Sequence, residues 1–199
     1  VPEISFLGHS VNDKGITPLT ERIEVIDRFL KPNTIKELKR FLGLLNFYRR
    51  HLPNAAAIQK PLHDLLKGSP ARNKIIDWTS TATEAFDNCK ALLRNSMLLA
   101  HPSPDANLVL HVDASDFAVG GALHQLIGND LQPLGFFSKK LTPRETRYSA
   151  YDRELLAVYL SNKHFRHMLE ARLFTIYTDH KPLTYAFRHN SFPTLVTRT

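Results

Sequence analysis

Apolar and polar residues alternate along three stretches in the second half of the chain. Asn107 to Asp113, Ala118 to Leu126 and Gln132 to Ser138 each carry the period-two pattern of a half-buried β-strand. The residues Gly-Asn-Asp at 128–130 supply the turn between the last two stretches. The pattern therefore predicts a three-stranded antiparallel meander.

The period then lengthens to that of a helix. Ser149 has the sequence context of a helix N-cap, and the apolar positions that follow predict one long helix that ends at about Leu169. A further strand is predicted from Leu173 to Thr178, and a short helix from Pro182 to Arg188. A strand, a crossover helix and a second strand normally form a right-handed unit with parallel strands.

The chain opens with a predicted β-hairpin. Ser5 to Val11 reads as an extended strand, Asn12 to Gly15 as a turn, and Ile16 to Pro18 as the returning strand. A two-stranded hairpin is marginally stable by itself in water, so we expect this one to belong to a larger sheet.

Four helices are predicted between this hairpin and residue 100. Thr34 with Glu37, and Thr81 with Glu84, have the spacing of capping boxes that begin the second and the fourth helix, and the third is predicted from Asn54 to Lys67. The predicted apolar faces are Ile23, Ile26 and Leu30; Ile35, Leu38, Leu42 and Leu45; Ile58, Leu62, Leu65 and Leu66; and Ala85, Phe86, Cys89, Leu92 and Leu93.

Composition and charge add to this picture. A hydrophobic content of 43% in 199 residues is enough for one or two domains with real cores, and the Pro-rich segment His101 to Asp105 predicts the boundary between two. The formal charge of the chain is +7, but the segment from Lys31 to Lys74 alone contains ten basic residues and only two acidic ones. This concentration favours a polyanionic partner over a merely solvated surface. The lone Cys89 indicates a reducing compartment.

Three acidic residues are predicted to converge. Asp113 and Asp179 end strands that would lie side by side and parallel, with neighbouring strands about 4.8 Å apart. Glu154 lies five residues after Ser149, or ~7 Å along the helix axis. Three carboxylates together suit Mg²⁺ or Mn²⁺, and two such ions can catalyse phosphodiester hydrolysis. The alternative is that these are turn and surface carboxylates with unrelated partners.

Eight sequence blocks extend this interpretation. In order, the chain contains SFLGH, ITPLTERIEVI, TIKELKRFLGLLNFYRR, KPLHDLLKG, DWTSTATEAF, HVDASDFAVGGALHQL, FFSKKLTPRETRYSAYDREL and IYTDHKPL. Their order and spacing resemble the reverse transcriptase and ribonuclease H region of a gypsy-class long-terminal-repeat retrotransposon Pol polyprotein. The resemblance implies an α+β or α/β chain: a primer-grip hairpin at the end of the palm (1–18), a helical thumb with a connecting helix (19–100), and a C-terminally truncated ribonuclease H-like domain (101–199).

The resemblance also implies functional residues. Asp113, Glu154 and Asp179 would be the catalytic and metal-binding acids, with two Mg²⁺ or Mn²⁺ ions in the intact site, and His180 would line that site or have a purely structural role. We assign Asp116 to a turn and give it no ligand role, and Asp152 to the helix cap. A glycine inside a helix costs about 1 kcal/mol relative to alanine, so Gly43 indicates a close approach to the backbone by a neighbouring helix or a phosphate. The expected nucleic-acid-binding residues are Phe6, Leu7, Gly8, His9, Lys36, Lys39, Arg40, Gly43, Arg49 and Arg50.

The family pattern also predicts what lies outside this chain. The fingers, most of the palm and the paired-aspartate motif of the polymerase are expected before Val1. The fourth acid, the last core strand and the final helix of the ribonuclease H fold are expected after Thr199, and no Asp or Glu follows Asp179.

We therefore expect a chain that binds RNA/DNA hybrid or a nucleic-acid duplex and, within the full-length protein, hydrolyses the RNA strand. The alternative is a catalytically inactive, nucleic-acid-binding remnant of a retroelement. The expected partners include the rest of the Pol polyprotein but no membrane. The expected location is the cytoplasm, in a virus-like particle, or the nucleus, without secretion.

Overall fold

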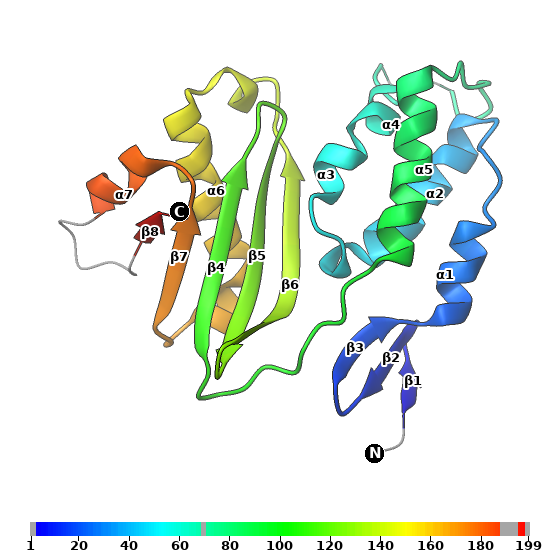
Figure 1. The fold of residues 1–199 in the computed structure, drawn as a ribbon. Helices are drawn as coiled ribbons and strands as arrows, with labels where there is room; N and C mark the ends of the chain where they lie inside the picture. The colour runs from blue at the N-terminus through cyan, green and yellow to red at the C-terminus, as the bar shows by residue number, and fades with distance from the viewer. Residues whose placement is uncertain (1–2, 69–70, 188–194, 198–199) are drawn as a thin grey trace. The chain divides into compact units, whose positions relative to one another are not determined.

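The computed structural model describes residues 3–68, 71–187 and 195–197, and the chain divides into two compact units, Val1–Leu98 and Leu99–Thr199. The first unit consists of a small sheet and short to medium helices, and the second of a five-stranded mixed sheet with a long helix (Figure 1). No helix among the described residues has the length and apolarity that crossing a membrane requires.

The N-terminal sheet has three antiparallel strands, β1 (Ile4–Phe6), β2 (His9–Asn12) and β3 (Gly15–Pro18). The predicted single strand from Ser5 to Val11 is therefore wrong: the chain reverses at Leu7 and Gly8, which have φ angles of +45° and +79°. The alternating pattern concealed this turn, because Leu7 is apolar and stands at a turn position that favours glycine or asparagine.

The helices of the first unit surround one hydrophobic core. Five of them are α1 (Thr20–Asp27), α2 (Ile35–Phe47), α3 (Ala55–Ile58), α4 (Lys60–Asp64) and α5 (Ser80–Arg94), and a short 3₁₀ helix, η1 (Arg49–His51), follows α2. Their buried side chains include Leu38, Phe41, Leu45, Leu62, Phe86, Cys89 and Leu93. The predicted core positions on α2 and α5 are thus largely confirmed.

The ends of these helices differ in how well the sequence predicted them. Thr34 and Glu37 form the predicted capping box of α2. The N-cap of α5 is Thr79, whose hydroxyl accepts a hydrogen bond from the backbone of Ala82, so the predicted start at Thr81 is wrong by two residues. The predicted third helix is divided at Gln59 into α3 and α4. Leu30 lies beyond the end of α1 and is 85% exposed.

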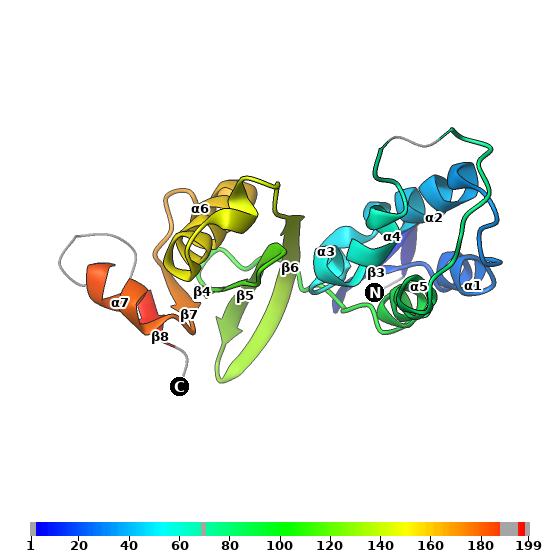
Figure 2. The same cartoon turned by 90° about the horizontal axis from the view of Figure 1, so that it is seen from above.

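The second unit contains the predicted meander, crossover helix and parallel strand. Strands β4 (Asn107–Ala114), β5 (Ala118–Ile127) and β6 (Asp130–Lys140) are antiparallel, and β7 (Phe174–Thr178) pairs parallel with β4. The long helix α6 (Ala150–Leu169), which follows the 3₁₀ helix η2 (Glu145–Arg147), lies on one face of the sheet (Figure 2).

A fifth strand corrects one expectation. β8 (Leu195–Thr197) follows α7 (Lys181–Phe187) and pairs parallel with β7, giving the strand order β6-β5-β4-β7-β8. The last core strand had been expected after Thr199. A three-residue strand is too short for a period-two pattern to identify. Arg188, the predicted end of the last helix, lies outside the described residues.

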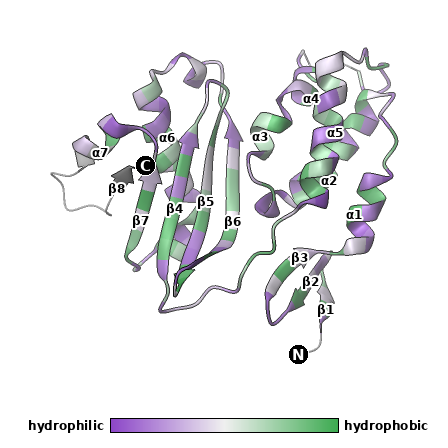
Figure 3. Cartoon of the chain, in the orientation of Figure 1, coloured by the Kyte–Doolittle hydropathy of each residue, from purple (hydrophilic) through white to green (hydrophobic). Residues whose placement is uncertain are grey.

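The core of the second unit lies between the sheet and α6. Hydrophobic and hydrophilic positions succeed one another along its strands (Figure 3). Leu110, Leu123 and Ile176 from the strands pack with Ala157 and Phe165 from α6 in one buried cluster. This packing fixes the helix above the strands whose ends carry the acidic residues.

Candidate metal centre

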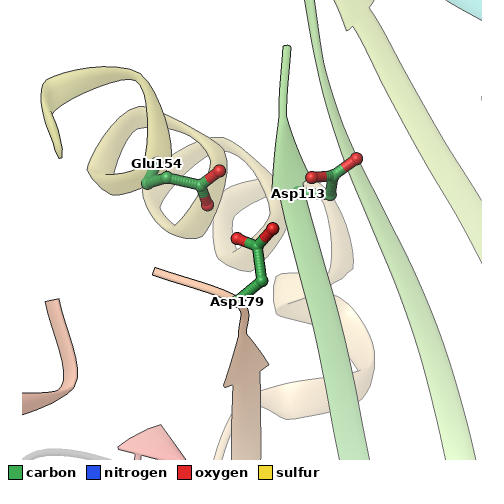
Figure 4. A group of neighbouring side chains, drawn as sticks. All are labelled: Asp113, Glu154 and Asp179. Carbon is green, nitrogen blue, oxygen red and sulfur yellow. The ribbon is translucent and has the colours of Figure 1, made fainter. Parts of the chain in front are cut away.

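Three carboxylates meet at the carboxyl ends of β4 and β7. Asp113 is the second-last residue of β4, Asp179 directly follows β7, and Glu154 lies near the start of α6. One carboxylate oxygen from each residue lies within 4.8 Å of the others. Figure 4 shows the three side chains directed toward a common space. The structure thus brings together the residues that the sequence predicted to converge.

The sheet register explains the proximity of the two aspartates. His111 pairs with Tyr177 at the end of the parallel ladder of β4 and β7, and Asp113 and Asp179 each follow two residues later, which leaves both near the same edge of the sheet. Ser149 caps α6 by accepting a hydrogen bond from the backbone of Asp152 at 3.1 Å, and its own hydroxyl donates to the Asp152 carboxylate. Asp152 therefore serves the helix cap, as predicted.

Glu154 is the buried member of the cluster. Its side chain accepts hydrogen bonds from the backbone N–H of Ala114, at 3.0 Å, and from the hydroxyl of Thr178, at 3.2 Å. Burial, together with the nearby charges of Asp179 and Asp113, raises the pKa of Glu154 to about 7 against the opposing effect of the hydrogen bonds from Ala114 and Thr178. Its carboxyl group can therefore exchange a proton for a cation near neutral pH.

The donor set fits a hard divalent cation. Three carboxylates supply only oxygen ligands, which Mg²⁺ and Mn²⁺ prefer, and their mutual repulsion is relieved when a cation binds between them. Asp113 and Asp179 are exposed, so a cation and a polyanionic substrate can reach them from solvent. The arrangement can support metal-assisted chemistry on phosphate esters.

His180 and Asp116 lie next to the cluster without joining it. The backbone N–H of His180 donates to the hydroxyl of Thr178, and its ring contacts Tyr151 edge-on with 5.7 Å between centroids. His180 thus contacts the residue that supports Glu154. Asp116 lies in the bend between β4 and β5, where its carboxylate accepts a hydrogen bond from Arg153.

The predicted basic residues of the first unit lie on α2 and in η1. Lys36, Lys39 and Arg40 are exposed on α2, Arg50 is exposed, and Arg49 is half-buried, which lowers its pKa. Apart from the adjacent residues and the nearby backbone of α2 itself, a Cβ atom at Gly43 would meet no described atom within 4 Å. The predicted approach of a neighbouring helix is therefore wrong for the described residues, and the glycine leaves the backbone open to a ligand.

The segment Phe6 to His9 contains the end of β1, the turn at Leu7 and Gly8, and the start of β2. Phe6 and Leu7 are exposed, whereas the carbonyl of Gly8 accepts a hydrogen bond from the hydroxyl of Tyr48 at 3.2 Å. The His9 ring contacts Phe47 and Tyr48. These two aromatic residues also line a groove of about 420 Å³ beside the turn. Sequence reasoning missed them, although the adjacent aromatics at the end of a basic helix were a usable signal.

Comparison with known proteins identifies the family. Residues 78–176 match the family described as the RNase H-like domain found in reverse transcriptase. The chain is 37% identical over 194 residues to the transposon Tf2-3 polyprotein of Schizosaccharomyces pombe (strain 972 / ATCC 24843), and equally to the Tf2-4 polyprotein. The match covers 96% of this chain but 14% of each polyprotein, so the chain spans about one seventh of the curated relatives' length.

Solved structures share the fold. The foamy viral protease-reverse transcriptase in complex with RNA/DNA hybrid is 22% identical, with a TM-score of 0.76 over 98% of this chain and 28% of that one. The same kind of protein in complex with dsDNA is 21% identical, with a TM-score of 0.78 over 98% of this chain and 44% of that one. The predicted resemblance to a retrotransposon Pol polyprotein is confirmed, and the chain belongs, through residues 78–176, to the family of RNase H-like domains found in reverse transcriptases.

Proposed function

We propose that this chain is the part of a retrotransposon reverse transcriptase that binds RNA/DNA hybrid and, in the full-length polyprotein, hydrolyses the RNA strand by two-metal-ion catalysis. The observation that carries the proposal is the convergence of Asp113, Glu154 and Asp179 within 4.8 Å, in a unit that matches the RNase H-like family. The foamy viral relative of the same fold was solved with RNA/DNA hybrid, which supports this choice of substrate.

The three acidic residues of the chain would have different roles in this reaction. Two Mg²⁺ or Mn²⁺ ions, when bound, supply an activated water and stabilise the leaving oxygen. Asp113 and Asp179 offer exposed carboxylates to the solvent side, where the phosphate backbone of the hybrid would lie. Glu154 holds a fixed orientation through Ala114 and Thr178 and loses its proton near neutral pH.

The test is cleavage of a hybrid with a labelled RNA strand in Mg²⁺, by this chain and by a longer segment of its polyprotein. Asp113→Asn, Glu154→Gln and Asp179→Asn should each lower the rate at least about 100-fold, because each removes a group that acts in the transition state. Asp130→Asn, an exposed acid at the start of β6, is the matched control and should cut like the parent. Equal cutting by all variants, or no cutting by either parent protein, would contradict the proposal.

A second function, nucleic-acid binding without catalysis, rests on the first unit. Lys36, Lys39 and Arg40 are exposed on one helix, and the open backbone at Gly43 follows on the same helix. We infer that this surface, with the Phe6 to His9 turn, contacts the phosphate backbone of a duplex. A catalytically inactive remnant would keep this binding and would show no metal-dependent cleavage.

A further inference from the structure

Arg153, the residue before Glu154, links the start of α6 to the end of β4. Its guanidinium donates one hydrogen bond to the backbone carbonyl of Tyr148, at 2.9 Å, and another to the carboxylate of Asp116, at 2.7 Å. The Arg153 side chain is only 16% exposed, whereas that of Asp116 is 72% exposed. Its Nε atom is buried and has no partner among the described residues, so the two terminal nitrogens anchor the group.

The loop that receives Arg153 is itself closed by hydrogen bonds. The hydroxyl of Ser115 accepts from the backbone of Phe117 and of Ala118, and the Ser115 N–H donates to the Ala118 carbonyl at 2.8 Å. The Phe117 carbonyl accepts from the N–H of Leu141 at 2.8 Å. Asp116 therefore has a fixed backbone on both sides, and its carboxylate gives Arg153 a defined anchor.

A second link between the same two elements passes through the metal centre. The Glu154 carboxylate accepts from the Ala114 N–H, but a cation that enters the cluster competes for the same carboxylate oxygens. The pair of Arg153 and Asp116 contains no oxygen of the three cluster acids. It can therefore keep α6 at one distance from the end of β4 while the bonds of Glu154 are exchanged.

We propose that Arg153 is a positioning residue, which with Asp116 clamps the first turns of α6 to the loop after β4 and so fixes Glu154 relative to Asp113. The clamp is a property of the fold, and its consequence for cation binding rests on the proposed function. An arginine suits this role because its planar fork donates in two directions at once, toward Tyr148 and toward Asp116, whereas a lysine offers a single nitrogen.

The experiment uses the full 199-residue chain with Arg153→Met, Arg153→Lys, Asp116→Ala and the double variant Arg153→Met/Asp116→Ala. Arg166→Met is the matched control, because Arg166 forms an exposed pair with Glu170 at 3.1 Å on the same helix. Amide hydrogen exchange at Ala114 and Ala118 reports the clamp without any metal. Titration with Mn²⁺ reports the cluster, and Asp113→Asn serves as the reference without a cation site.

We expect Arg153→Met and Asp116→Ala to accelerate exchange at Ala114 at least about tenfold and to raise the Mn²⁺ dissociation constant about tenfold, as for other groups that orient metal ligands. Arg153→Lys should recover part of both effects, and the double variant should be no worse than Arg153→Met, since the two residues form one interaction. Arg166→Met should match the parent, and thermal midpoints should stay within about 4 °C of it.

Each result decides the proposal. Unchanged exchange in Arg153→Met would overturn the clamp, whatever happens to cation binding. Faster exchange with an unchanged Mn²⁺ affinity would overturn the positioning role. A parent protein that binds no Mn²⁺ would overturn the proposed metal centre and, with it, that role, while the exchange rates would still show whether the clamp exists.

Discussion

Three carboxylates of similar chemistry have different surroundings in the candidate metal centre. Asp113 and Asp179 are exposed, whereas Glu154 is 5% exposed and accepts two hydrogen bonds from the surrounding fold. Burial is the largest of the causes that raise the pKa of Glu154 to about 7. At the scale of single residues, burial and hydrogen bonding hold the Glu154 side chain in one orientation, whereas Asp113 and Asp179 remain exposed to solvent.

His51 illustrates the same effect on a basic group. Its ring is fully buried, hydrogen-bonds through Nδ1 with the Met97 carbonyl at 3.0 Å, and stacks on His9. Burial lowers the pKa of His51 to about 4. The unfolded chain takes up this proton at about pH 6.5, so the contribution of neutral His51 to stability is complete above pH 6.5 and is lost as the pH falls through 4.

We expect His51→Gln, which keeps a donor for the Met97 carbonyl but does not titrate, to remove this part of the acid sensitivity. Between pH 7 and 4, the parent should lose about 3 kcal/mol more of its unfolding free energy than the variant loses. Urea unfolding at a series of pH values measures the difference. His167→Gln, at an exposed position of α6, should follow the parent curve. Parallel curves for parent and His51→Gln would contradict the prediction.

At the scale of elements, the contact of α6 with β5 depends on a missing side chain. A Cβ atom at Gly121 would overlap the side chain of Ser161, with only 2.7 Å to the Ser161 Cβ. Ser161 is itself fully buried. The small residues of this stretch therefore let a helix approach the sheet closely, which supports the placement of Glu154 on that helix.

Gly121→Ala should destabilise the chain by about 1–3 kcal/mol, the usual cost of overpacking a closed interface. Ser161→Gly in the same chain should restore part of that stability, because it removes the overlapping atoms. Gly43→Ala on α2 is the matched substitution at an open position, and it should stabilise by roughly 1 kcal/mol through helix propensity. Thermal unfolding measures the stability of the three variants. Equal effects of Gly121→Ala and Gly43→Ala would show that the close packing of Gly121 against Ser161 does not matter for stability.

At the scale of the whole molecule, charge is unevenly distributed along the chain. The segment from Lys31 to Lys74 carries ten basic and two acidic residues, a net of +8, against +7 for the entire chain. Lys36, Lys39 and Arg40 are exposed there on α2. A duplex that contacts them would release counterions, so its affinity should fall steeply as salt concentration rises.

Replacing Lys36, Lys39 and Arg40 together by glutamine should reduce the slope of log affinity against log salt by up to about 3, because each side chain that pairs with a phosphate contributes about 1. Fluorescence anisotropy with a labelled RNA/DNA hybrid over a range of KCl concentrations gives the slope. The charge-conserving variant Lys36→Arg/Lys39→Arg/Arg40→Lys should keep the parent slope. If the glutamine variant also keeps it, these residues do not contact the phosphate backbone.

Much of this architecture could be predicted from local pattern. The meander, the crossover helix, the parallel strand and the caps at Thr34 and Ser149 follow from side-chain periodicity and from hydrogen bonds within a few residues. The predictions of strands and helices that were wrong concern places where the backbone adopts an unusual conformation or where an element is very short. Leu7 adopts a positive φ angle, Gln59 divides a helix, and β8 is three residues long.

The sequence alone determined which acids would meet, because strand order and helix length follow from patterns that are repeated over many residues. Only the tertiary structure decided their environments. Glu154 is buried by this packing. The hydrogen bonds that Glu154 accepts from Ala114 and Thr178, and the one that Arg153 donates to Asp116, connect segments up to forty residues apart. Such contacts depend on how elements pack, and packing depends on the shapes of many side chains at once, which no local pattern records.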